Sequence, residues 1–85
     1  MAELTFTLHE ATSVLHERAR VRLANAVAVA RRAEARLGKP FKRPAAELAA
    51  AQHARQALRR VEACTKTLEF WNRAMARVLD RETSP

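Results

Sequence analysis

Apolar and small residues recur along the second half of the chain at intervals of three and four. The main row runs through Ala51, Ala54, Leu58, Val61, Thr65, Leu68, Asn72, Met75 and Leu79. Its average step of about 3.5 residues keeps one helix face turned toward a partner in a left-handed coiled coil. A second row, spaced by seven, consists of Ala50, Ala57, Cys64, Trp71 and Val78. Two adjacent rows form a wide face, so this helix is expected to pack against more than one neighbour.

The first half of the chain carries a similar stripe at the ordinary helical period of about 3.6 residues. Its members are Leu8, Ala11, Leu15, Ala19, Leu23, Ala26, Ala30, Ala33 and Leu37. Thr7 and Glu10 fit a capping box, in which each side chain accepts a hydrogen bond from the backbone amide of the other. Phe6, just before the cap, could pack onto Ala11. The pattern predicts that the first helix starts directly after Thr7.

Gly38 and Pro40 interrupt the helical pattern between the two halves. Glycine can close a helix end in the left-handed conformation, and a proline soon afterwards prevents the helix from resuming. Pro44 suits the first turn of the next helix, where no amide donor is required. The connector of residues 38–43 is short enough to fold the second helix back antiparallel to the first.

The predicted fold is therefore all-α, an antiparallel helical hairpin with helices at about residues 8–37 and 44–82. We expect one domain over residues 1–85, with a lead-in at 1–6 and a frayed tail at 83–85. Much of the hydrophobic content is alanine, which buries little area, so an 85-residue hairpin would be marginal alone. We expect a homodimer that completes a four-helix bundle.

The second helix is the longer one, and its excess is expected at the C-terminal end. Without cover from the first helix, that end would need a second subunit or the N-terminal lead-in. Asn72 in the main row fits a register-setting polar position, or else a solvated residue near the bundle end. The predicted interface for self-association or a partner comprises Leu58, Val61, Leu68, Trp71, Asn72, Met75, Val78 and Leu79.

The net charge of +7 is unevenly distributed along the chain. Residues 1–17 hold three glutamates and no Lys or Arg, residues 18–60 hold twelve basic against two acidic residues, and residues 61–85 hold four of each. In a hairpin the middle segment forms the turn half, which should be strongly basic. Like charges four residues apart, such as Arg55 and Arg59, oppose helix stability, which suggests that the charge has a use.

Arginine offers a rigid fork for phosphate and carboxylate oxygens. The candidate polyanion-binding residues are Arg18, Arg22, Arg31, Arg32, Arg36, Lys39, Lys42, Arg43, Arg55, Arg59 and Arg60. They could contact a nucleic-acid backbone or an acidic protein surface, or they could form a solvated face in an arginine-biased composition. The sequence lacks helix-turn-helix and zinc-finger signatures and has few aromatic residues, so contact with bases is not expected.

One cysteine and three histidines are the remaining candidates for chemistry. In the predicted hairpin Cys64 lies near the level of His16, whereas His53 lies near Ala28, far from His9. A Cys–His pair can act as nucleophile and base or as half of a metal site. No glycine-rich loop or second ligand motif accompanies it, so Cys64 is interpreted as a small buried residue. We expect no enzyme activity, no cofactor, no metal and no small-molecule substrate.

The single cysteine fits a reducing compartment, and no apolar run approaches the roughly 20 residues needed to span a bilayer. The N-terminus lacks the basic start and apolar core of a signal peptide, so a cytoplasmic location without membrane association is expected. Phe41, Phe70 and Trp71 are either packed in the hairpin or exposed as anchors for a partner.

Three functional hypotheses follow. The first is a non-enzymatic hairpin that self-associates and binds a polyanion through its arginine-rich end. The second is a small helical chaperone or adaptor that covers a partner's helix with the apolar face around Leu68, Trp71, Met75 and Leu79. The third is a modulator that docks its basic surface onto a nucleic-acid-binding enzyme.

Overall fold

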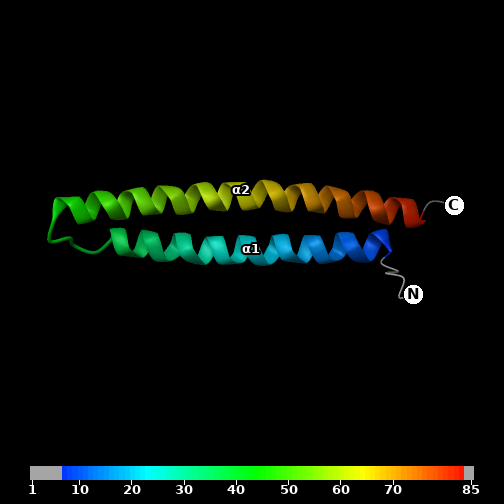
Figure 1. Cartoon of the computed structure of the whole chain (residues 1–85), viewed down its shortest axis with the longest axis horizontal. Coiled ribbons are helices and arrows are strands. Elements are labelled where there is room, and N and C mark those ends of the chain that lie inside the picture. Colours follow the sequence, from blue (N-terminus) through cyan, green and yellow to red (C-terminus); the bar gives the residue numbers. More distant parts are fainter. Residues whose placement is uncertain (1–6, 84–85) are drawn as a thin grey trace, which may run out of the picture.

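A computed structural model describes the backbone of residues 7–83 and the side chains of residues 7–81. Helix α1 spans Leu8–Leu37 and helix α2 spans Pro44–Thr83. The helices run side by side in opposite directions, and the molecule is 64 Å long and 14 Å thick (Figure 1). The predicted all-α hairpin is confirmed, with α2 ending one residue later than expected.

The N-terminus of α1 is closed by the capping box that the sequence predicts. The amide of Glu10 donates to Thr7 Oγ1 at 3.1 Å, and the amide of Thr7 donates to Glu10 Oε2 at 3.4 Å. Thr7 itself is extended, with φ −66° and ψ 155°, so it stands just outside the helix. The predicted packing of Phe6 lies outside the described residues.

The C-terminus of α1 differs from the prediction. Gly38 has φ −74° and ψ −7°, so the left-handed closure expected there is wrong. Its amide donates to the carbonyl of Glu34 at 3.3 Å, and the amide of Lys39 donates to Arg36 at 3.2 Å. The helix thus ends by tightening its last turn, which satisfies carbonyls without a positive φ.

The two helices pack along one row of each, which we call the seam. Its buried members on α1 are Thr12, Ala19, Ala26, Ala30 and Ala33, and on α2 they are Ala50, Ala54, Ala57 and Val78. Half-buried members fill the gaps, namely His16, Leu23, Val61, Cys64, Leu68, Trp71 and Met75. Along each helix these positions alternate by three and four, as in a left-handed coiled coil.

The apolar stripe predicted for α1 is wrong over its first two turns. Leu8 and Leu15 are 58% and 38% exposed, whereas Thr12 and His16 face α2. The prediction used a period of 3.6 residues, but a coiled helix presents its partner with a period of 3.5. Counted from Ala19 toward the N-terminus at that shorter period, the positions that face α2 are His16 and Thr12.

The seam of α2 is also displaced from the main row of the prediction. Four members of that row face α1, and the row spaced by seven supplies the rest. The members left outside are Ala51, Leu58, Thr65, Asn72 and Leu79, which follow the seam along one flank. Of the predicted interface, five residues therefore pack within the hairpin, namely Val61, Leu68, Trp71, Met75 and Val78.

The ribbon of α2 extends past α1 at both ends of the hairpin, and further at the turn end (Figure 1). Its first turns are exposed there, including Leu48 at 62%. The prediction placed all of the excess at the terminal end and expected Met75 and Val78 to lack cover there, but Val78 is buried and Met75 is half-buried. Residues 38–43 carry the chain beyond the end of α1 before it reverses. Each residue of α2 therefore faces a different level of α1 from the one that the predicted hairpin gave.

Polar groups in and beside the seam have hydrogen-bond partners. The hydroxyl of Thr12 donates to the carbonyl of Leu8 at 2.7 Å, and that of Thr65 donates to Val61 at 2.8 Å. Across the helices, His16 Nε2 lies 2.6 Å from Asn72 Oδ1. The hydroxyls are satisfied within their own helices, so the His16–Asn72 pair is a polar contact that depends on the register.

We predict that Ala57→Leu destabilises the hairpin by about 1–3 kcal/mol, because Ala57 is buried between the helices and a larger side chain would force them apart. Urea unfolding followed by circular dichroism measures the change. Ala76→Leu, on an exposed position of the same helix, is the control and should alter stability by less than about 0.5 kcal/mol. Equal effects of both substitutions would contradict the alanine seam.

Candidate functional site

One flank of the seam carries a groove between the helices. Arg22, Asn25 and Val29 of α1 and Arg60 of α2 line a hollow of about 470 Å³ there. Toward the turn, Arg36 and His53 line the next hollows. The basic residues that line these hollows are Arg22, Arg32, Arg36, His53 and Arg60, and we call this stretch the arginine groove. No acidic residue lines it.

The same side of the molecule continues beyond the groove. Residues seven apart share one side of a helix in a coiled coil, so Arg18 lies in line with Asn25 and Arg32. On α2, Ala63 lines a hollow of the groove, and Arg77 lies two such steps further on. The side defined by these positions, which we call the arginine side, carries Arg18, Arg22, Arg32, Arg36, Arg60, Arg77, Arg81 and His53.

The glutamates of the two helices fall mostly on the opposite flank, which we call the glutamate side. It carries Glu10, Glu17, Glu34, Glu62 and Glu69 together with Arg20, Arg31 and Arg55. Asn72 reaches His16 from this flank. Among the described residues charge is therefore separated across the width of the molecule as well as along its length. Glu17 still shares the hollow on the outer face of α1 with Arg18 and Arg22.

The arginines of the groove form no ion pair with an acidic residue in the part of the chain whose side chains the structure describes. Among the described side chains, the ion pair that forms joins Arg20 and Glu17 at 3.5 Å, outside the groove. Arg32 instead donates to the carbonyl of Ala28 at 3.4 Å. All four groove arginines are exposed. Guanidinium groups along one groove without acidic partners can donate hydrogen bonds to phosphate oxygens of a ligand.

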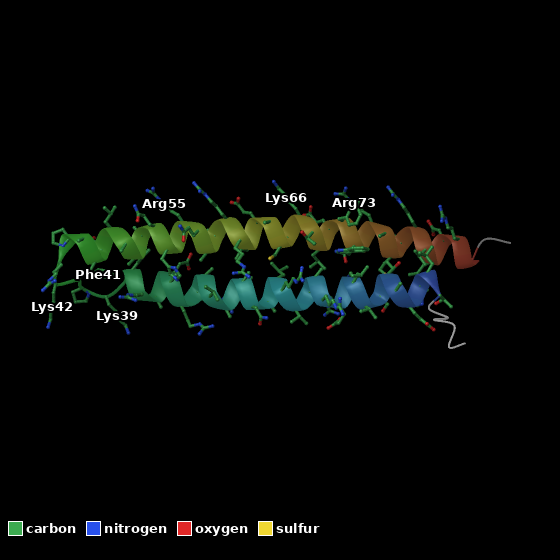
Figure 2. The ribbon with its side chains drawn as sticks, viewed as in Figure 1. Lys39, Phe41, Lys42, Arg55, Lys66 and Arg73 are labelled. Carbon is green, nitrogen blue, oxygen red and sulfur yellow. The ribbon has the colours of Figure 1, made fainter. Side chains whose placement is uncertain are left out.

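The structure brings together some of the predicted polyanion-binding residues and separates others. Arg22, Arg32, Arg36 and Arg60 meet in the groove, and Arg18 borders the hollow on the outer face of α1. The others lie on the glutamate side (Arg31, Arg55), on the outer face of α2 (Arg59) and in the connector (Lys39, Lys42, Arg43). Figure 2 shows Arg55 directed away from α1 and both lysines at the turn end.

Sequence reasoning missed Arg77, Arg81 and His53 as members of this side. Two of them fall in the segment whose charges balance along the chain, and that balance conceals their position. For His53 and Arg81 the signal was their position seven residues before and 21 residues after Arg60, combined with a correct seam. The prediction assigned the seam one residue away, so the flanks could not be assigned.

The candidates for chemistry do not assemble. Cys64 lies in the groove near Arg22 and Ala26, away from the predicted level of His16, which meets Asn72 instead. His53 lies near Ala33 and Arg36. No group of three metal-ligating side chains occurs among the described residues. Neither described helix contains an apolar stretch long enough to cross a bilayer.

One large aromatic side chain stands on the arginine side. Phe70 lies seven residues beyond Ala63 of the groove and is 59% exposed. Its ring packs edge-on against Trp71, with centroids 5.0 Å apart and planes at 82°. Trp71 is half-buried in the seam, so it supports the exposed ring from below. Phe41, in the connector, is half-buried (Figure 2).

Comparison with known proteins gives no relative for this chain. No family model, no curated protein and no solved structure matches it. Its function is therefore argued from the arrangement of its own residues.

We predict that a glutamate in the groove stabilises the hairpin, since the arginines there repel one another. Asn25→Glu places a carboxylate three residues from Arg22 and across the groove from Arg60, and should add about 0.5 kcal/mol. Ser13→Glu is the matched substitution on the glutamate side, between Glu10 and Glu17, and should destabilise by a similar amount. Thermal unfolding at low and high salt measures both changes. Stabilisation by both variants would contradict the separation of charge.

Proposed function

We propose that the chain is a non-enzymatic helical hairpin that binds the phosphate backbone of a nucleic acid along its arginine side. The observation that carries the proposal is the arginine groove, where four exposed arginines from two helices line two adjoining hollows without an acidic residue. A sequence pI of about 11.3 adds long-range attraction for a polyanion. Clustering of basic residues on one face is the electrostatic footprint expected of such a protein.

The dimensions of the groove suit several consecutive phosphates. From Arg22 to Arg36 the helix rises about 21 Å, since each residue adds about 1.5 Å. Phosphates of one strand in a duplex are about 3.4 Å apart along the axis, so about six would pass the groove. Arginine can meet phosphate oxygens with two parallel hydrogen bonds, which favours backbone contact without a fixed base sequence.

The test compares two triple variants with equal loss of charge. The groove variant carries Arg22→Gln, Arg36→Gln and Arg60→Gln, and the control carries Arg31→Gln, Arg55→Gln and Arg59→Gln. Each phosphate contact contributes about 0.7 to 0.9 to the slope of log affinity against log salt. The groove variant should therefore lose about 2 to 3 in that slope, as measured by fluorescence anisotropy with labelled oligonucleotides over a salt series.

The control variant should keep most of the slope, because its three arginines lie on the glutamate side and the back of α2. Equal losses in both variants would show that net charge alone drives binding and would contradict the groove. Absence of oligonucleotide binding by the unaltered chain would contradict the proposal itself and leave an acidic protein surface as the ligand to test.

We further propose that the hairpin forms a homodimer through the glutamate side. That side combines both signs of charge with the exposed side chains Leu48, Leu58 and Leu79. Two arginine sides facing one another would place like charges in contact, which disfavours the alternative packing. A dimer formed in this way leaves both arginine grooves open to a ligand.

Light scattering should give a molar mass near twice the 9.6 kDa of one chain. Leu58→Glu should reduce it to that of one chain by introducing a charge among apolar contacts, whereas Val29→Glu on the groove side should leave the dimer intact. A monomeric unaltered chain, or dissociation by Val29→Glu instead, would contradict the assignment. Circular dichroism of both variants verifies that the helices remain.

A further inference from the structure

We infer that the arginine side binds single-stranded nucleic acid, with one base stacked on Phe70. The inference rests on the proposed function, since it names the form of nucleic acid that the same side would take. It also departs from the expectation that the chain makes no contact with bases. The observation behind it is a large, exposed aromatic ring in line with the arginine groove.

The surroundings of Phe70 are basic. On the surface of α2 its neighbours three and four residues away include Lys66 and Arg73, and Arg77 follows seven residues later on the arginine side. Lys66 and Arg73 extend outward from α2, away from α1 (Figure 2). The nearest acid in sequence, Glu69, lies about 100° around the helix. An exposed ring with cationic neighbours suits a nucleotide, whose base is flat and whose phosphate is negative.

The ring is also held in place. Trp71 contacts it edge-on at 5.0 Å and is itself half-buried against α1. Because the planes of the two rings stand at 82° in a T-shaped contact, Trp71 covers at most one face of Phe70 and leaves a face for a base. A stacking platform that is already oriented loses less conformational entropy when a base packs on it.

A continuous path joins the ring to the groove. Phe70 and Ala63 are seven residues apart on α2, and Ala63 lines the same hollow as Arg22 and Thr67. The separation along the helix axis is about 10 Å. A single strand can splay a base onto the ring while its backbone follows the arginines. In a duplex the bases are paired and stacked, so the ring would find no free base face.

The charge of this surface disfavours other occupants. A second copy in a symmetric contact would bring its own arginine side against the first, and the proposed dimer uses its glutamate side elsewhere. An apolar partner helix would cover Phe70 but would leave the adjacent arginines without partners. A single-stranded polyanion matches both the ring and the charge, and is the occupant that we propose.

The test measures the affinity of the full chain for a 20-nucleotide oligo-deoxythymidine and for a duplex of equal length at one salt concentration. Phe70→Ala should weaken binding of the single strand by about fivefold to 150-fold, the loss typical of one stacked base. Its affinity for the duplex should change by less than about twofold, since phosphate contacts remain. Leu37→Ala, on an exposed leucine at the C-terminal end of α1 outside both the arginine side and the proposed dimer interface, is the matched control and should leave both affinities unchanged.

A second readout follows the ring directly. Trp71 is the single tryptophan of the chain and contacts Phe70. Binding of the single strand should alter its fluorescence, and binding of the duplex should alter it far less. Phe70→Trp should retain single-strand affinity, since it keeps an aromatic face, whereas Phe70→Leu should lose it while keeping an apolar side chain.

Unchanged single-strand affinity in Phe70→Ala, or equal affinity of the unaltered chain for both forms, would overturn the inference while leaving backbone binding by the groove intact. Failure of the proposed function is recognised separately, because the unaltered chain would then bind neither form. A role of Phe70 in contacting a protein would also leave oligonucleotide affinity unchanged, so that outcome counts against the inference. Circular dichroism verifies that each variant remains helical.

Discussion

Close packing of two helices along an alanine-rich seam is the interaction on which the rest of this structure depends. Small residues at Ala30, Ala33, Ala54 and Ala57 let the helices approach over the turn half, where large side chains are scarce. Each alanine buries little area, so the packing depends on many small contacts of matching shape. The hairpin is one layer thick, and much apolar surface stays exposed as a result.

The seam also decides the electrostatics. Once the row facing the partner helix is set, every other position on each helix is assigned to one flank or to the back. In this chain one flank receives arginines and a histidine, and the other receives most of the helical glutamates. Concentrating like charge in this way opposes folding slightly, since neighbouring guanidinium groups repel. A bound polyanion would remove that repulsion, which links the proposed function to the stability of the fold.

The proposed ligand uses both halves of the molecule. The turn half supplies convergent arginines in the groove, and the terminal half supplies Phe70 on its support, Trp71. The polar pair of His16 and Asn72 lies in this terminal half, where the seam contains larger and more polar side chains. A register set there would fix the position of Phe70 relative to the arginines of α1. Fold and site are therefore coupled through the same contacts between helices.

Local sequence signals alone determined much of this protein: two helices, the capping box at Thr7 and Glu10, the turn after Gly38 and an excess of arginine. Such features depend on residues close in sequence, so propensity and spacing suffice to predict them. The tertiary structure decided the rest. Because the coil has a period of 3.5 residues, His16 rather than Leu15 lies in the seam. The path of the connector decides which residues of α1 and α2 face each other. Both depend on contacts between distant segments. For that reason only the packed hairpin separates the arginine side from the glutamate side and places Phe70 beside the groove.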